Sequence, residues 1–147
     1  MLYFRILQDR NFSLVHPIFH IFRFFLSRKT GIEIHPETMI GMGFRMVHAR
    51  DISINSEAIL GKNINMYKGS TIGNSGGVHK GVPKIGNHVQ IGINSTVIGG
   101  ITIGDDVLIA PNTLVNFDVP SHSIVIGNPA KIIYKENATK EYIYFCC

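Results

Sequence analysis

A repeat of six residues constrains this chain more than any other feature. Between residues 85 and 115 an aliphatic residue opens each unit of six, and the fifth place of each unit is small or β-branched. The opening positions are Ile85, Ile91, Val97, Ile103, Ile109 and Val115. A period of six fits neither a helix nor one alternating strand. It is typical of a parallel β-helix, an all-β solenoid in which three short strands close each triangular coil.

The same six-residue period extends towards the N-terminus, although two of its positions, Ala58 and Ser70, hold weaker residues. These earlier positions are Ile34, Ile40, Met46, Ile52, Ala58, Ile64 and Ser70. The interval from Ser70 to Ile85 is not a multiple of six, so the register breaks between them. We expect residues 74–84, which are rich in glycine and contain a proline, to leave the coils as a loop. A long insertion in a strict solenoid is usually functional or mobile.

The 147 residues are enough for one domain with a substantial core. We expect an N-terminal helical segment at 1–31, a solenoid at 32–133 and a C-terminal tail at 134–147. The sequence leaves the conformation of that tail open.

Residues 12–28 form an apolar run interrupted by histidines, arginines and Pro17. We expect a helix with Pro17 in its first turn and Gly31 as its C-terminal cap. The run is too short and too interrupted to span a membrane, and no small-residue cleavage site follows it. Two interpretations stay open. The helix packs on the end of the solenoid or on a neighbouring subunit, or it is a basic amphipathic helix that lies on a membrane surface.

The net charge of +4 comes from scattered lysines and arginines, so no basic stripe supports binding to nucleic acid. The basic residues suit an anionic ligand such as a phosphorylated cofactor. The two cysteines, Cys146 and Cys147, are adjacent and form neither a disulfide framework nor a metal cluster. The seven histidines are too dispersed for a metal site. A cytoplasmic protein is expected, either free or peripheral to the inner face of the membrane.

Four short motifs occur in a fixed order along the solenoid. They are Glu33-Ile34-His35-Pro36, then His48-Ala49, then Ser75-Gly76-Gly77 leading into Pro83-Lys84-Ile85-Gly86, and finally Gly127-Asn128-Pro129-Ala130-Lys131. Together they resemble the serine acetyltransferase branch of the hexapeptide-repeat acyltransferases, and the short chain is similar to polysaccharide O-acetyltransferases. The resemblance implies a left-handed β-helix, a homotrimer, acetyl-CoA as donor and a site between subunits. The left hand comes from the resemblance alone, because parallel crossovers usually favour the right hand.

By resemblance, His48 is the general base and Glu33 is its acidic partner. Moving an acetyl group to a hydroxyl needs a base for the hydroxyl proton and donors for the developing oxyanion, and histidine suits the first task near neutral pH. Glu33 and His48 are separated by nearly one coil of 18 residues, so they could approach each other across stacked coils. The family usually has Asp in place of Glu33. Without the resemblance, His48 would be interpreted as a corner residue of the coil.

The donor's pantetheine arm is expected along a groove between coils, lined by backbone near Gly92-Ile93 and Ala110-Pro111. Lys84 and Lys131 are candidates for its phosphates, although both also suit plain surface charges. Gly76 and Gly77 of the loop are further donor-site candidates. His79 is a candidate for the acceptor, since relatives often have an Arg-His pair in this loop; here the arginine is missing and the frame is shifted.

The acceptor is expected to be the hydroxyl of a small molecule. Serine-specific relatives carry a large N-terminal helical domain, an Asp before the catalytic His and the loop arginine, whereas this chain has Val47 and no loop arginine. A site without those groups has little to hold a zwitterion. We therefore expect a saccharide hydroxyl, as in surface-polysaccharide synthesis, with L-serine as the alternative. A trimeric scaffold without catalysis is the non-enzymatic alternative.

Overall fold

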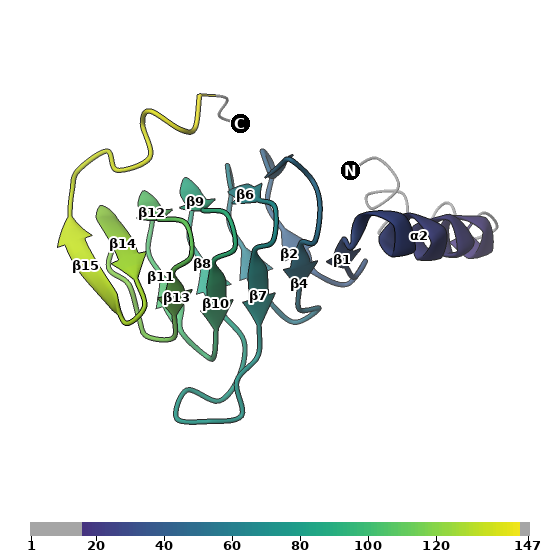
Figure 1. Ribbon diagram of the computed structural model, residues 1–147, viewed down its shortest axis with the longest axis horizontal. Coiled ribbons are helices and arrows are strands. Elements are labelled where there is room, and N and C mark those ends of the chain that lie inside the picture. Colours follow the sequence, from purple (N-terminus) through teal and green to yellow (C-terminus); the bar gives the residue numbers. More distant parts are fainter. Residues whose placement is uncertain (1–15, 145–147) are drawn as a thin grey trace.

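The structure, a computed structural model, describes residues 16–144. Positions 12–15 of the apolar run and the cysteine pair Cys146 and Cys147 lie outside this range. Helix α2 (His16–Thr30) leads into a stack of short strands (Figure 1). Gly31 ends the helix with a φ of 68°, and its N–H donates a hydrogen bond to Ser27 O at 2.7 Å. This is the C-terminal cap expected at that glycine.

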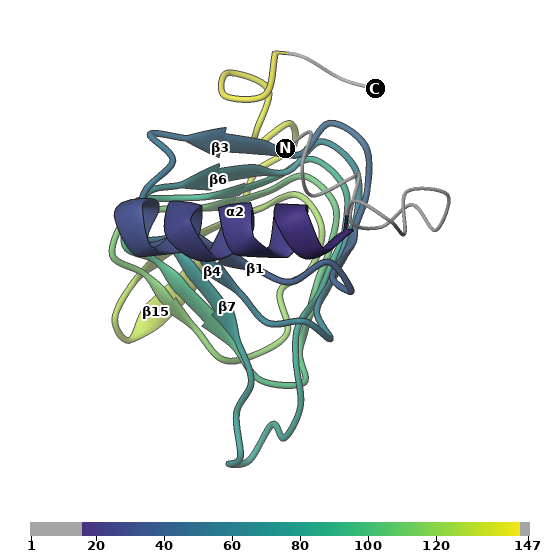
Figure 2. The same cartoon turned by 90° about the vertical axis from the view of Figure 1, so that its right-hand side faces the viewer.

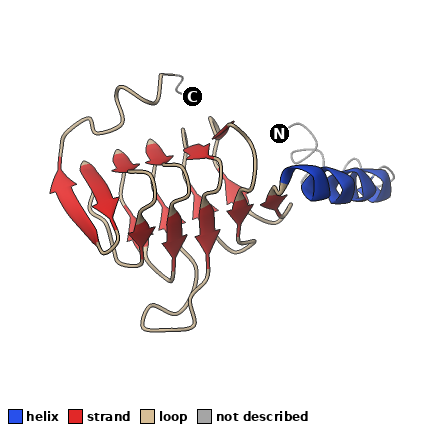
Figure 3. Ribbon diagram, viewed as in Figure 1, coloured by secondary structure: helices blue, strands red, loops and turns tan. Residues whose placement is uncertain are grey.

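The strands form three sheets, one for each side of a triangular coil (Figures 2 and 3). Sheet A contains β1 (Glu33–Ile34), β4 (Ser53–Ile54), β7 (Thr71–Gly73), β10 (Thr96–Ile98) and β13 (Leu114–Val115). Sheet B contains β2 (Met39–Ile40), β5 (Ile59–Leu60), β8 (Lys84–Ile85) and β11 (Thr102–Ile103). Sheet C contains β3 (Arg45–Val47), β6 (Asn65–Tyr67), β9 (Val89–Ile91), β12 (Val107–Ile109), β14 (Ser123–Gly127) and β15 (Ala130–Tyr134).

The chain visits sheets A, B and C in turn, and the strand order of each sheet follows the order of the coils. All strand pairs are parallel except the terminal hairpin of β14 and β15. Each coil therefore stacks its inward-facing side chains on those of the coil before. The six aliphatic positions predicted between residues 85 and 115 are all buried, which confirms the solenoid and its period. Deleting one such side chain from a packed core typically costs about 2–5 kcal/mol.

The six-residue period predicted up to residue 70 gives the wrong register between the first two coils, although the residues it selects are buried or partly buried. Ile34 pairs with Ile54 rather than stacking under Ile52. This first repeat is 20 residues long, whereas the one from Thr96 to Leu114 is 18. Two extra residues therefore lie between β3 and β4. After these two residues, the predicted period falls on the second inward position of each unit. Small residues are normal at that position, which explains the small side chains of Ala58 and Ser70.

The predicted loop leaves the solenoid between β7 and β8 and projects from it (Figure 1). Thr71 pairs with Thr96, 25 residues away, so this coil carries seven residues more than an 18-residue coil. The base of the loop is closed by two hydrogen bonds of 3.0 Å between the backbones of Ser75 and Gly81. The loop also rests on the next coil, since Gly100 N donates to His79 O at 2.9 Å.

Helix α2 lies beyond β1 at the N-terminal end of the stack (Figures 1 and 2). It exposes the side chains of Ile21, Phe24 and Phe25, and the guanidinium of Arg28 lies 5.0 Å from the centroid of the Phe24 ring. Within residues 16–144, no helix combines the length and the apolar character needed to cross a bilayer.

Candidate functional site

His48 lies at the corner between sheets C and A, directly after β3. It is exposed and adopts a φ of 52°. The pairing of Val47 with Tyr67 and the hydrogen bond from Lys68 N to Val47 O place Lys68 above it in the next coil. Because β3 is the edge strand of sheet C, His48 stands at the open end of this corner.

The predicted donor residues continue the same corner, coil by coil. Met66 pairs with Ile91, and Ile91 pairs with Ile109, so Gly92-Ile93 and Ala110-Pro111 succeed Lys68 in register. With about 4.8 Å between strands, Pro111 lies about 14 Å along the corner from His48. The structure thus brings His48, Gly92-Ile93 and Ala110-Pro111 onto one line along this corner. We call this line the corner groove, after the donor groove expected along it.

The absence of a side chain at Gly92 has a structural reason of its own. A Cβ at this position would lie 2.7 Å from Ile109 O and from Pro111 N, so only glycine lets the two coils stack. The glycine therefore serves coil packing.

Lys131 lies on β15, at the opposite end of sheet C from His48. Its strand partner is Ile126, close to the hairpin turn at the same corner. Five strand spacings of about 4.8 Å separate β3 from β15, which amounts to about 24 Å. Lys131 is exposed near the far end of the same corner.

Glu33 also belongs to the first coil, but it lies on sheet A. One carboxylate oxygen accepts a hydrogen bond from Ser53 Oγ at 3.5 Å, the limit for such a bond. Although both residues are described, no hydrogen bond or ion pair joins Glu33 to His48. The 20-residue first coil explains this, because the spacing argument assumed a coil of 18.

The loop candidates lie at a different corner. Gly76, Gly77 and His79 are exposed on the loop, which leaves β7 at the end opposite to the corner groove. Lys84 begins β8 on sheet B and lines a shallow hollow of about 300 Å³ with Thr102 and Asp105, among others. Within one chain, the width of sheet A separates all four residues from His48.

Sequence reasoning missed the covering of sheet C by the C-terminal tail. Residues 135–144, which we call the strap, turn back from β15 across β12, β9 and β6 (Figure 1). Its residue Ala138 packs with Leu108 and Ile124, which face outward from the sheet. Two apolar residues at outward positions were the available signal, because an outward position without a cover is normally polar.

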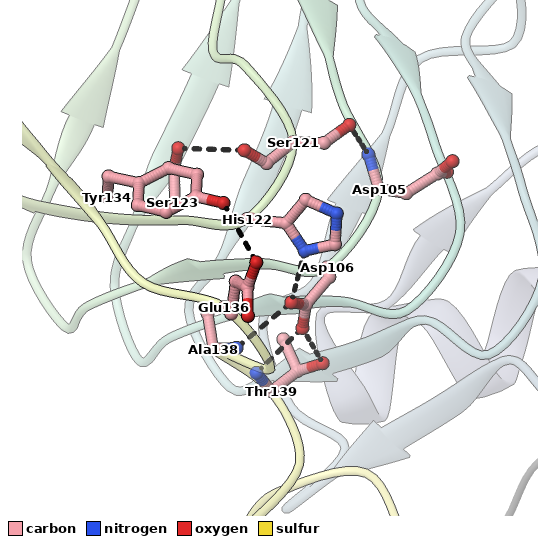
Figure 4. Close-up of polar contacts among 9 residues, drawn as sticks. All are labelled: Asp105, Asp106, Ser121, His122, Ser123, Tyr134, Glu136, Ala138 and Thr139. Carbon is pink, nitrogen blue, oxygen red and sulfur yellow. Dashed lines mark hydrogen bonds and ion pairs between the residues drawn. The ribbon is translucent and has the colours of Figure 1, made fainter.

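Asp106 fastens the strap at one end (Figure 4). Its carboxylate accepts hydrogen bonds from Ala138 N at 3.0 Å, from Thr139 N at 2.9 Å and from Thr139 Oγ1 at 2.8 Å. The ring of His122 adds a contact of 2.9 Å from Nδ1. Burial raises the pKa of Asp106, but these hydrogen bonds favour the charged form and hold its pKa below the usual 3.8.

A mostly apolar pocket of about 260 Å³ lies between the strap and the corner groove. It shares Gly92, Ile93 and Pro111 with the groove. Its remaining walls come from Tyr67, Gln90, Leu108, Ile109 and the strap residue Tyr142. Among the described residues, no three His, Cys, Asp or Glu side chains lie close enough together to hold a metal ion.

Comparison with known proteins agrees with the fold. Residues 83–116 match the family described as bacterial transferase hexapeptide (six repeats). The chain is 37% identical over 129 residues to serine acetyltransferase 2 of Arabidopsis thaliana, covering 80% of this chain and 40% of that protein. It is 39% identical over 108 residues to serine acetyltransferase of Helicobacter pylori, covering 73% and 63% of the two chains.

Among solved structures, serine acetyltransferase of Neisseria gonorrhoeae superposes with a TM-score of 0.77 at 32% identity, covering 90% of this chain and 52% of that one. The Neisseria protein has also been solved in complex with serine. The chain thus spans between 40% and 63% of the length of these relatives. The likeness confirms the left-handed β-helix and the resemblance to serine acetyltransferases.

Proposed function

We propose that this hexapeptide-repeat chain is an acetyl-CoA-dependent O-acetyltransferase with His48 as its general base. The supporting observation is the corner groove, which begins at an exposed imidazole and continues over Gly92-Ile93 and Ala110-Pro111 towards Lys131. An arm of aliphatic and amide character suits the groove, and Lys131 suits the phosphates. The relatives' name, serine acetyltransferase, supports the same chemistry.

In this mechanism the acceptor's hydroxyl oxygen attacks the carbonyl carbon of the thioester while His48 takes the hydroxyl proton. The carbon–sulfur bond then breaks, and the departing thiolate receives the proton from the His48 imidazolium. The products are an acetyl ester and the free thiol of CoA. Such a base contributes typically 10²–10⁴-fold, on the order of 3–5 kcal/mol of the barrier.

Glu33 is the proposed acidic partner in the first coil. Its single hydrogen bond to Ser53 Oγ, at 3.5 Å, is weak and leaves the exposed carboxylate free to turn. A carboxylate near an imidazolium stabilises the charged ring as the proton moves.

A homotrimer would complete the site. His79, Gly76, Gly77 and Lys84 lie at a corner that the chain's own His48 does not share, so a neighbouring subunit has to supply them. The loop tip is suited to reach such a neighbour, since Val78 is 97% exposed there.

For the acceptor, the comparisons favour L-serine over the saccharide expected from the sequence. All the relatives compared above are named serine acetyltransferases, and the Neisseria protein binds serine in its crystal. A saccharide hydroxyl remains the second candidate because of one local feature. Val47, half-buried at the end of β3, offers no charge to the amino group of serine beside His48.

The test is release of free thiol from acetyl-CoA with L-serine, nucleotide sugars and glycans as separate acceptors. Turnover with serine would identify a serine acetyltransferase, whereas turnover with saccharides alone would establish the second candidate. Thiol release with none of them, from a protein that also fails to bind CoA, would overturn the proposal and favour the scaffold.

A further inference from the structure

The strap is held at two points on sheet C that lie two coils apart. Near one end, Asp106 of the fourth coil receives the hydrogen bonds from Ala138 and Thr139. Near the other end, Asn65 Nδ2 in the second coil donates to Tyr142 O at 2.9 Å. Ile143, the residue after Tyr142, is buried, and Tyr142 N and Ile143 N both donate to Thr139 O. Two anchors and an internal turn therefore fix the backbone that carries Tyr142.

Tyr142 closes the outer side of the 260 Å³ pocket, whose inner side is the corner groove. The pocket has a polar group at its base that the fold leaves unsatisfied. Gln90 is only 7% exposed, and its Oε1 has no hydrogen-bond partner. A buried acceptor without a partner is uncommon, and the amide N–H of a ligand would satisfy it.

We propose that Tyr142 is a donor-binding residue and that Gln90 accepts a hydrogen bond from an amide N–H of the thioester's pantetheine arm. This inference rests on the proposed function. The pocket is continuous with the corner groove through Gly92, Ile93 and Pro111, and it combines aliphatic walls with one amide oxygen. That combination matches an aliphatic arm interrupted by amides better than a purely hydrocarbon acyl chain. Asp106 and Asn65 are positioning residues, since they act only through the strap.

The experiment measures the dissociation constant for CoA by titration calorimetry and the KM and kcat for acetyl-CoA. Tyr142→Ala is expected to weaken CoA binding about tenfold and to raise KM with little change in kcat, because an aromatic wall is removed. Tyr142→Phe keeps that wall and should bind CoA like the unmodified protein. Tyr144→Ala is the matched control, since Tyr144 is on the same strap but 72% exposed.

Two further variants separate a binding role from a structural one. Gln90→Leu is expected to weaken CoA binding several-fold while the melting temperature stays the same or rises, because the unsatisfied buried oxygen is gone. Asp106→Asn weakens the attachment of the strap and is expected to raise KM in the same direction as Tyr142→Ala. Glu141→Gln removes one negative charge from an exposed strap position and is the control for it.

The outcomes distinguish this inference from the proposed function. An unmodified protein that does not bind CoA contradicts both. CoA binding that Tyr142→Ala and Gln90→Leu leave unchanged overturns the inference alone. A Tyr142→Ala protein that binds CoA normally but now accepts longer acyl groups also overturns it, since the pocket would then hold the acyl chain.

Discussion

The backbone of His48 occupies the left-handed region, which non-glycine residues enter at a cost. The same conformation occurs at other corners of the solenoid, for instance at Asn94, Asn112 and His88. A positive φ therefore marks a corner, for which Asn, Asp and His are the usual non-glycine choices. What distinguishes His48 is its place at the open end of the corner groove.

This conformation decides which substitution tests catalysis cleanly. His48→Asn keeps a residue that tolerates the left-handed corner and removes the imidazole, so we expect thiol release to fall by about 10²–10⁴-fold while the melting temperature stays nearly unchanged. The matched control is His88→Asn, at a corner with a φ of 53° on the other side of sheet C. A His48→Asn enzyme with full activity would contradict the assignment of the base.

The hydrogen bonds from Ala138 and Thr139 to the Asp106 carboxylate predict that the attachment of the strap depends on pH. Its lowered pKa means that the charged carboxylate stabilises the closed strap above pH 3.8, and that this stabilisation is lost as the pH falls through the lowered value. His88, His122 and Lys140 line the adjoining cavity of about 350 Å³ and are the other titratable groups that face it.

We therefore expect the amide chemical shifts of Ala138 and Thr139 to hold steady from neutral pH to about pH 4 and to move only below about pH 3.8. NMR titration of the protein is the measurement. In Asp106→Asn this acid transition should disappear. A transition near neutral pH instead would assign control of the strap to a histidine.

Among the elements, the sheets were predictable and the strap was not. Aliphatic residues every six positions report the inner face of a coil wherever they lie in the chain, so β8 to β13 follow from sequence alone. The strap has no period, and its anchor joins Asn65 to Tyr142 across 77 residues. The sequence indicates the strap only indirectly. Leu108 and Ile124 are apolar residues at outward positions of sheet C, and Gln90 is a polar residue that is buried in the fold.

Helix α2 has an apolar face that the described part of the chain does not cover, formed by Ile21, Phe24 and Phe25. We expect this face to pack on a neighbouring subunit. The double variant Phe24→Ser, Phe25→Ser should then raise the dissociation constant of the oligomer at least tenfold, since each buried Phe contributes roughly 1.5–3 kcal/mol.

Sedimentation equilibrium checks this, with Lys29→Ser, an exposed change in the same helix, as control. An oligomer that withstands the double variant, together with loss of binding to anionic vesicles, would instead support the membrane-surface interpretation of this helix.

At the scale of the whole molecule, the proposed division of the site between two corners of neighbouring subunits makes a prediction about mixed trimers. A His48→Asn protein keeps a normal loop, and a protein lacking residues 76–80 keeps a normal His48. We expect each to be inactive alone and activity to return when the two are unfolded and refolded together, because some interfaces then pair an intact groove with an intact loop. Mixtures that stay inactive, although mixed trimers form, would place the whole site within one subunit.

The register of the whole stack shows where sequence reasoning about the site was limited. The period predicted which residues face inward, but the pairing of Glu33 with Ser53 depends on the length of one corner. Each six-residue unit has two inward positions, and both hold buried side chains. An insertion of two residues moves the period from one inward position to the other, so the sequence pattern does not reveal it. The expected approach of Glu33 to His48 assumed that these two extra residues were absent.

The corners that carry these extra residues tolerate length because they take no part in the ladders. One corner holds two additional residues and another holds seven, yet the strands on either side pair as if nothing intervened. In such a solenoid, a corner segment can be replaced by a longer or shorter one without changing how the strands pair. A relative's loop grafted between Gly73 and Lys84 is therefore expected to leave the strands of the solenoid paired as they are.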